Sequence, residues 1–88
     1  MLKNKRVLIT GANGGIGSSI AEILLKNHAK LVLFYHKDRT QIDKLLEKNV
    51  NQKDNIETHN LDLLKTKEIE KTVSKIIEKK IDVFIHAV

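Results

Sequence analysis

Four short apolar runs are spaced along the chain, and each has the length of a β-strand. Arg6–Thr10 contains Val-Leu-Ile and stops at a glycine, and Lys30–Tyr35 is continuously apolar after its first residue. Residues 56–61 form a weaker run, and residues 81–88 form the fourth. Apolar runs of this length without polar alternation are typical of strands covered on both faces in a parallel sheet. The pattern therefore predicts four strands.

Between these runs, apolar side chains recur at the spacing of one helix face. The first helical segment follows a cluster of glycines and ends near residues 27–28, the second spans about residues 39–49, and the third about residues 66–80. The stripes expected to be buried are Ile16, Ile20, Ile23 and Leu24, then Ile42, Leu45, Leu46 and Val50, and finally Ile69, Val73, Ile76 and Ile77. Residues 51–55 are polar and predict a turn.

All four glycines of the chain lie between the first strand and the first helix, in Thr10-Gly11-Ala12-Asn13-Gly14-Gly15-Ile16-Gly17. A helix N-terminus presents unpaired N–H groups and a partial positive charge, so it binds phosphate readily. Gly11, Gly15 and Gly17 stand where a sharp turn, a close approach to pyrophosphate and tight helix–sheet packing need glycine. A mononucleotide P-loop would need a lysine after the last glycine, where this chain has Ser18. The loop predicts a dinucleotide site.

Strand and helix alternate throughout, which predicts an α/β fold, a parallel sheet with helices on both faces. With the phosphate loop after the first strand, the crossover rule favours a Rossmann-like strand order of 3-2-1-4. No linker or repeat divides residues 1–88, so we expect one unit. The fourth strand would be an uncovered edge, which complete domains avoid, and this indicates the first half of a larger domain. Such an edge also favours a homo-oligomer or edge-paired association.

Composition narrows the classes of function. The absence of Cys excludes a disulfide scaffold and thiol-based metal or redox chemistry. Sixteen Lys and Arg against eleven Asp and Glu give a formal charge of +5, but lysine is scattered and interleaved with glutamate, which does not favour nucleic acid as a partner. Apolar runs are too short to span a bilayer, and no signal peptide is complete, so we expect a cytoplasmic protein with no membrane partner.

The glycine motif, followed by Ala21, resembles the cofactor loop of the short-chain dehydrogenase/reductase family, and within it the 3-oxoacyl-[acyl-carrier-protein] reductases and their relatives. Asn60-Leu61-Asp62-Leu63 is similar to the family segment after strand three, whose Asp accepts a hydrogen bond from the adenine amino group. Residues 81–88 resemble the strand-four segment Ile-Asp-Ile-Leu-Val-Asn-Asn-Ala-Gly, with His86-Ala87 where the family usually has Asn-Asn. The resemblance covers essentially the whole chain and implies an NAD(P)-dependent oxidoreductase.

The family's catalytic Ser and Tyr-x-x-x-Lys have no counterpart in this sequence, because Tyr35 is its only tyrosine and has Arg39 four residues on. We therefore expect no catalytic residue and no activity from these 88 residues alone. A small carbonyl or alcohol substrate is implied for the complete enzyme. The alternatives are a non-catalytic nucleotide-binding module and a truncated fragment without independent function.

Cofactor choice is read at the end of the second strand, where NAD-dependent enzymes place an acidic residue on the ribose. Tyr35 falls at that position here, and His36, Lys37 and Arg39 follow it. Their positive charge favours a 2′-phosphate and hence NADP, with NAD as the alternative. Asp38 opposes this preference. Alternatively, Lys37 and Arg39 are ordinary solvent-exposed residues at the start of a helix.

The remaining histidines, His28 and His59, share no metal-ligand spacing, so no metal site is expected, and His28 is expected in a turn. The residues expected to bind the cofactor are Gly11, Asn13, Gly14, Gly15, Ile16, Gly17, Tyr35, His36, Lys37, Arg39, Asp62, Leu63, His86 and Ala87.

Overall fold

The computed structural model describes residues 2–62 and 64–87. In chain order its elements are β1 (Arg6–Thr10), α1 (Gly15–Lys26), β2 (Lys30–Tyr35), α2 (Thr40–Lys48), the 3₁₀ helix η1 (Val50–Asn55), β3 (Ile56–Asn60), α3 (Thr66–Ile77) and β4 (Val83–His86). The strands pair in parallel in the order β3-β2-β1-β4. The predicted fold class and strand order are confirmed.

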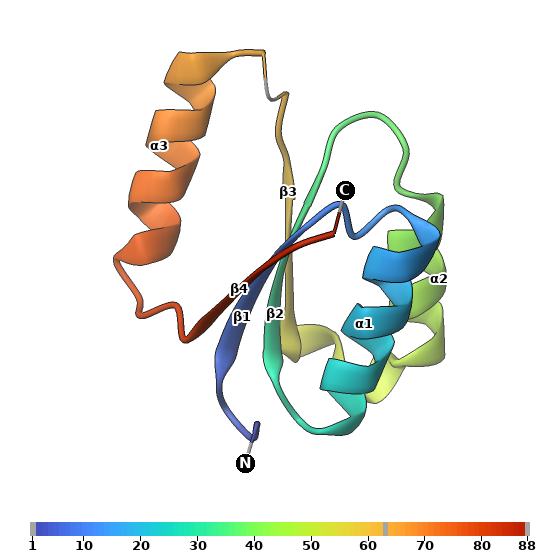
Figure 1. The fold of residues 1–88 in the computed structure, drawn as a ribbon. Coiled ribbons are helices and arrows are strands. Elements are labelled where there is room, and N and C mark those ends of the chain that lie inside the picture. Colours follow the sequence, from blue (N-terminus) through green and yellow to red (C-terminus); the bar gives the residue numbers. More distant parts are fainter. Residues whose placement is uncertain (1, 63, 88) are drawn as a thin grey trace.

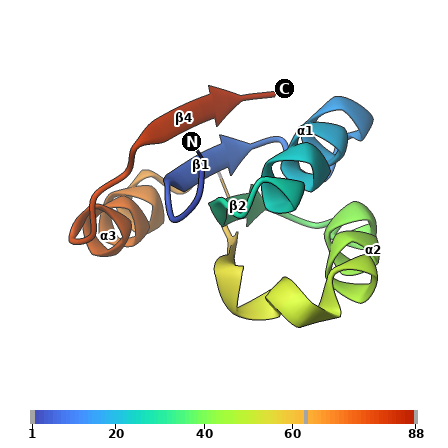
Figure 2. The same cartoon turned by 90° about the horizontal axis from the view of Figure 1, so that it is seen from below.

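The sheet is covered on both faces. Figure 1 shows α3 on one side of the strands and α1 with α2 on the other, and Figure 2 shows the same layers along the sheet. Successive residues of a strand point to opposite faces, so each central strand needs apolar side chains at every position. Leu31 and Leu33 pack with α1 and α2, whereas Val32 and Phe34 pack on the face that α3 covers. This explains the continuous apolar run of β2.

Several boundaries differ from the sequence prediction. The second helix covers 40–48 rather than 39–49, and η1 takes the place of the turn expected at 51–55. The third strand ends at residue 60 instead of 61, and α3 ends at residue 77 rather than 80. Of the predicted run 81–88, the fourth strand covers 83–86 among the described residues, and residue 88 lies outside them. The backbone N–H of Asp82 still donates to the carbonyl of Arg6, so the approach to β4 is already fixed alongside β1.

The buried stripe predicted for the first helix is wrong at two positions. Ile16 is 75% exposed and Ile23 is 59% exposed, whereas the buried residues of α1 are Gly17, Ala21 and Leu25. The rotation of the helix follows from Gly17, because only a residue without a side chain can lie so close to the loop that precedes the helix. Two further residues predicted to be buried, Val50 at the start of η1 and Ile77 of α3, are each 61% exposed.

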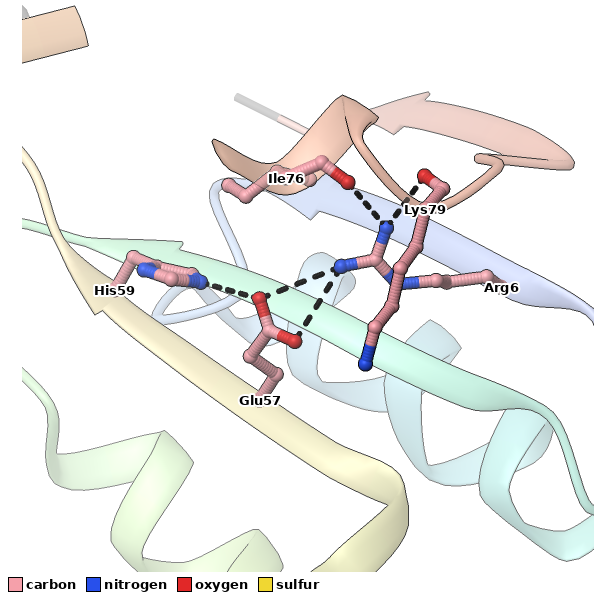
Figure 3. A network of polar contacts seen from close by, with 5 residues as sticks. All are labelled: Arg6, Glu57, His59, Ile76 and Lys79. Carbon is pink, nitrogen blue, oxygen red and sulfur yellow. Dashed lines mark hydrogen bonds and ion pairs between the residues drawn. The ribbon is translucent and has the colours of Figure 1, made fainter. Parts of the chain in front are cut away.

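Arg6 joins three elements at the end of the sheet opposite the glycine loop (Figure 3). Its Nη1 donates to the carbonyls of Ile76 and Lys79, at 2.5 and 2.9 Å, at the C-terminus of α3. Its Nη2 lies 3.3 Å from Glu57 Oε1 on β3, and His59 Nε2 lies 2.5 Å from the other oxygen of Glu57. The guanidinium thereby satisfies carbonyls that the end of a helix leaves unpaired.

The outer side of β4 carries exposed apolar residues. Val83 is 39% exposed and Phe84 is 59% exposed, although both stand in register with buried residues of β1. Among residues 2–62 and 64–87, no strand pairs with β4 on that side. In the same part of the chain, no helix has the length and apolar character needed to cross a membrane.

Candidate functional site

The glycine loop leaves the carboxyl end of β1 and leads directly into α1. Gly11 has a φ of 75°, in the left-handed region that side chains disfavour, and its carbonyl accepts a hydrogen bond from the Gly14 N–H at 3.1 Å. A Cβ on Gly17 would lie 2.2 Å from the Gly11 oxygen. The backbone therefore requires glycine at both positions, one for the turn and one for the close approach of the helix.

The first turn of α1 is open to a ligand. Gly14 is the N-cap, no side chain within the described residues caps the helix, and its first turn holds no acidic residue. A Cβ on Gly15 would meet no atom within 4 Å, so its surroundings do not require glycine, whereas a ligand approaching the backbone would. The N–H groups of Gly15, Ile16 and Gly17 stand at positions that lack acceptors inside the helix. Together these features suit an anion.

A cavity of about 220 Å³ adjoins this loop at the carboxyl ends of β1 and β2. It is lined by Thr10, Gly11, Asn13, Phe34, Tyr35, His36 and Leu61. The residues come from three neighbouring strand ends and from the glycine loop, as expected for a ligand crevice in a parallel sheet. We call it the loop cavity. Four of the predicted site residues, Gly11, Asn13, Tyr35 and His36, are brought together here.

A second cavity lies beside it, at the ends of β2 and β3 and the start of α3. It is lined by His36, Lys37, Asn60, Asp62, Lys65 and Glu68, and we call it the polar cavity. Asp62 Oδ1 accepts a hydrogen bond from the Leu64 N–H at 2.9 Å, and Asp62 Oδ2 lies 3.7 Å from His36 Nε2. His36 and Asp62 were both predicted as site residues and stand 26 positions apart in the sequence. In the structure they are neighbours.

Arg39 is not among the residues that line either cavity, and it has partners of its own. Its Nε donates to Asp43 Oδ1 at 2.8 Å, its Nη1 donates to the Tyr35 hydroxyl at 3.1 Å, and its guanidinium stacks 5.0 Å from the centre of the Tyr35 ring. The hydrogen bond to Asp43, with that to Tyr35, raises the pKa of the Arg39 guanidinium. Hydrogen bonds from Thr40 lower the pKa of Asp38, so a negative charge persists beside the cations.

Hydrogen bonds join the carboxyl end of β4 to the carboxyl end of β1, where the glycine loop begins. The Thr10 hydroxyl and His86 Nδ1 share a hydrogen bond of 2.6 Å, and the Ala87 N–H donates to the Thr10 carbonyl at 3.0 Å. His86 therefore fixes the two strand ends to each other, where the family motif has Asn. Leu63, which the sequence also placed in the site, lies outside the described residues.

Three residues of the loop cavity were missed by the sequence analysis. Thr10 begins the glycine motif, and its position at a strand end could have marked it as a candidate. Phe34 and Leu61 look like core residues in the sequence, and both are indeed mostly buried. Only their place at the carboxyl ends of β2 and β3, on the crevice side, gives them a second role as walls of the cavity.

Comparison with known proteins agrees with this arrangement. The family described as short chain dehydrogenase matches residues 5–88, so the chain belongs to the short-chain dehydrogenase family. A curated relative, the uncharacterized oxidoreductase YmfI of Bacillus subtilis (strain 168), is 47% identical over 45 residues, which are 51% of this chain and 19% of the relative.

Two solved structures are similar over nearly the whole chain. One is a Bacillus thuringiensis protein assigned provisionally as a 3-oxoacyl-reductase, with a TM-score of 0.82, 24% identity, and coverage of 97% of this chain and 36% of that one. The other is ElxO with NADP bound, with a TM-score of 0.77, 26% identity, and coverage of 96% and 34%. The chain spans about a third of the length of these two proteins.

Proposed function

We propose that the chain is the dinucleotide-binding part of a short-chain oxidoreductase, with residues 1–88 acting as one unit, and that it binds NADP(H) in preference to NAD(H). The observation that carries this proposal is the glycine loop. Gly11 makes the turn, Gly17 brings α1 against the loop, and the space at Gly15 is open toward solvent. That is the cradle a pyrophosphate needs at a helix N-terminus.

The adenosine half of the ligand would lie in the loop cavity. Phe34 and Leu61 offer apolar surface to a base, and the backbone around Gly11 and Asn13 borders the same space. Asp62, whose Oδ2 lies 3.7 Å from His36 Nε2, would accept a hydrogen bond from the adenine amino group, as the resemblance to the family implies. The ribose would then face Tyr35 and His36 at the end of β2.

The nicotinamide half would extend toward the end of β4. There His86 and Thr10 fix the strand ends, and Ala87 is held by its N–H. When bound, the nicotinamide ring accepts or donates a hydride at C4. The residues described here bind and orient the dinucleotide, and proton transfer to a small carbonyl substrate, or from an alcohol in the reverse reaction, would need the family's Ser and Tyr-x-x-x-Lys, which this sequence does not contain.

Two observations support NADP over NAD. No acidic residue occupies the end of β2, where Tyr35 and His36 stand. The structure of ElxO holds NADP. A non-catalytic nucleotide-binding module is the second candidate. NADPH oxidation with a β-ketoester, above the rate without protein, would exclude the module.

The test separates binding from folding by one substitution. Gly15→Ala places a methyl group in open space, so we expect stability unchanged or raised by up to about 1 kcal/mol. The same methyl group occupies the path of the pyrophosphate. We therefore expect titration calorimetry to give NADP⁺ affinity about tenfold weaker, which corresponds to one lost charge-assisted hydrogen bond.

Ser19→Ala is the matched control, because it changes the exposed side of the same helix turn and lies outside the loop cavity. It should leave the NADP⁺ affinity unchanged. Equal binding by the Gly15→Ala variant and the parent chain, or no dinucleotide binding by a folded parent chain, would refute the proposed site.

A further inference from the structure

The amino end of the sheet, opposite the glycine loop, collects the positive charge of the molecule. The four strands are parallel, so they all begin at this end, and the helices that connect them all end there. Figure 2 shows the molecule from this side. The end consists of the segments that lead into the strands, together with the last turn of each preceding helix. We call it the basic end, and its segments are residues 2–6, 23–30, 45–57 and 74–82.

The whole formal charge of +5 belongs to the basic end. Its segments hold ten of the 16 Lys and Arg residues but only five of the 11 Asp and Glu residues. The rest of the chain holds six of each, so its charges cancel. Along the chain lysine is interleaved with glutamate, and for that reason the sequence does not favour nucleic acid as a partner. The fold changes this, because it brings four distant segments to one side of the molecule.

Most of these cations are free to meet a ligand. Nine of the ten are lysines, and all nine are exposed. Within the described part of the chain, two cations of the basic end are paired, Arg6 with Glu57 at 3.3 Å and Lys80 with Asp82 at 3.5 Å. The other eight lysines form no ion pair with another described residue.

The helix ends account for only part of this charge. A helix C-terminus carries a partial charge of about −0.5, so Lys26, Lys48 and Lys75 in the last turns stabilise their own helices. Three such partial charges do not cancel a charge of +5. The remaining lysines of the basic end lie outside the α-helices, and they are Lys3, Lys5, Lys30, Lys53, Lys79 and Lys80.

The chemistry of this end favours the phosphates of a double-stranded nucleic acid over other polyanions. Clustered, unpaired lysines are the usual basis of sequence-independent contact with a phosphate backbone. Proteins bind single strands largely by stacking bases on aromatic rings, and the four segments contain no Phe, Tyr or Trp.

A lipid surface fits this end less well. Insertion into a bilayer needs apolar side chains that project from the basic end. Ile23 and Ile77 are exposed, but side chains of an α-helix lean toward its N-terminus and therefore away from this end. Of the large exposed apolar residues in the four segments, that leaves Val50 alone.

We propose that the basic end is a docking face for the phosphate backbone of a double-stranded nucleic acid, bound without regard to base sequence. The face contains none of the residues expected to hold a dinucleotide, which lie at the opposite end of the strands. The inference therefore goes beyond the proposed function and does not rest on it.

The test is the fluorescence anisotropy of a labelled duplex of about 20 base pairs, titrated with the chain at several salt concentrations. We expect a dissociation constant of about 1–100 μM at about 150 mM salt, the range of non-specific binding. The logarithm of the association constant should fall linearly with the logarithm of the salt concentration. A slope of about −4 is expected, which corresponds to four or five neutralised phosphates.

A triple variant locates the contact. Lys3→Gln, Lys30→Gln and Lys53→Gln together remove one unpaired, exposed lysine from each of three segments of the basic end. At about 50 mM salt this variant should bind the duplex at least about tenfold more weakly. The slope should become less steep by about two to three, because each lost phosphate contact reduces it by about one.

The matched control removes the same number of lysines from the part of the chain whose charges balance. Lys44→Gln, Lys67→Gln and Lys71→Gln together replace three exposed lysines that form no ion pair with another described residue. Both triple variants therefore have the same net charge. The control should keep the slope of the parent chain and an affinity within about threefold of it. Circular dichroism checks that both variants fold.

Equal weakening in the two triple variants would overturn the inference, because overall charge rather than the basic end would then bind the duplex. Absence of duplex binding by the folded parent chain at low salt would also overturn it. Tighter binding of a single strand of the same length, or binding to phosphatidylglycerol vesicles without binding to the duplex, would show that the partner is wrong. None of these results changes the expected binding of NADP⁺, so the proposed function is tested separately.

Discussion

His28 occupies the residue position at which α1 ends in a left-handed turn. Its φ is 62°, its N–H donates to the Leu25 carbonyl at 2.9 Å, and the Ala29 N–H donates to the Leu24 carbonyl at 3.1 Å. These two hydrogen bonds define the Schellman ending of a helix, for which glycine is the usual residue in the left-handed position. The sequence expectation that His28 is a turn residue is confirmed, and it carries a conformational cost.

His28→Gly should therefore stabilise the chain. Removing the left-handed strain at this residue should raise the free energy of unfolding by about 1–2 kcal/mol. The greater conformational freedom of glycine in the unfolded chain should lower it by about 0.4–1 kcal/mol. The net gain of about 0.5–1 kcal/mol corresponds to a rise in Tm of about 3–6 °C for a domain of this size. Thermal unfolding followed by circular dichroism measures it.

Asn27→Gly is the control at the neighbouring position. Asn27 has a φ of −96°, so no strain is relieved, and its side chain donates to the Ile23 carbonyl at 2.9 Å. This variant should lower the Tm. A His28→Gly variant that also melts below the parent chain would show that the histidine side chain contributes more than its backbone costs.

At the scale of elements, the Arg6 network ties β1 to β3 and to the end of α3 (Figure 3). Burial alone would raise the pKa of Glu57, but hydrogen bonds from His59 and Arg6 outweigh it, so the pKa of Glu57 is lowered from 4.5. A carboxyl with a lowered pKa in the folded chain stabilises it above the unfolded pKa. This contribution is lost as pH falls through the folded pKa.

Glu57→Gln should therefore flatten the acid dependence of stability. Between about pH 5 and pH 3 the parent chain should lose more stability than the variant, by about 0.5–1 kcal/mol, since the ion pair is partly exposed to solvent. Urea unfolding at pH 5.5, 4.5 and 3.0 measures this in a range where histidines are ordinarily protonated. Parallel curves for the two proteins would mean that Glu57 does not couple to folding.

The same reasoning applies to Asp82, which accepts a hydrogen bond from the Arg6 N–H at 2.9 Å. That hydrogen bond, more than the nearby lysines, lowers the pKa of Asp82. Protonation of Asp82 at low pH should therefore destabilise the folded chain, as protonation of Glu57 does. It remains in the Glu57→Gln variant, so the variant should keep a residual acid dependence.

At the scale of the whole molecule, β4 is the element with the least cover. Phe84 is paired in register with Leu8, yet it is 59% exposed on the face that α3 covers for the central strands. Apolar residues on an unpaired strand edge favour association with another edge. We therefore expect the edge-paired association predicted from the sequence to involve β4.

We predict that the 88-residue chain self-associates through β4 and that Phe84→Lys reduces this association. Light scattering after size exclusion should show an average mass that rises with concentration for the parent chain and less steeply for the variant. Ile23→Lys is the matched control, because Ile23 is also 59% exposed but lies on α1. An equal reduction of self-association by both substitutions would indicate non-specific hydrophobic association instead. A strictly monomeric parent chain with one sharp thermal transition would mean that residues 1–88 form a stable domain alone.

Much of the fold was predictable because its signals are local. The apolar runs predicted β1 and β2 with their observed bounds, and strict alternation with helices predicted a parallel sheet with a strand order that the structure confirms. The roles of two glycines were also predictable, because a left-handed turn at Gly11 and a close contact at Gly17 both require a residue without a side chain. Such requirements act over a few residues and can therefore be recognised in the sequence.

The tertiary structure decided what depends on residues distant in the sequence. Periodicity placed Ile16 and Ile23 on the buried face of α1, but the helix packs on the sheet through Gly17, Ala21 and Leu25, which leaves both isoleucines exposed. His36 and Asp62 met only because β2 and β3 end side by side in the sheet. Side-chain pairing of this kind follows from strand order and helix rotation, and therefore appears only when the chain is folded.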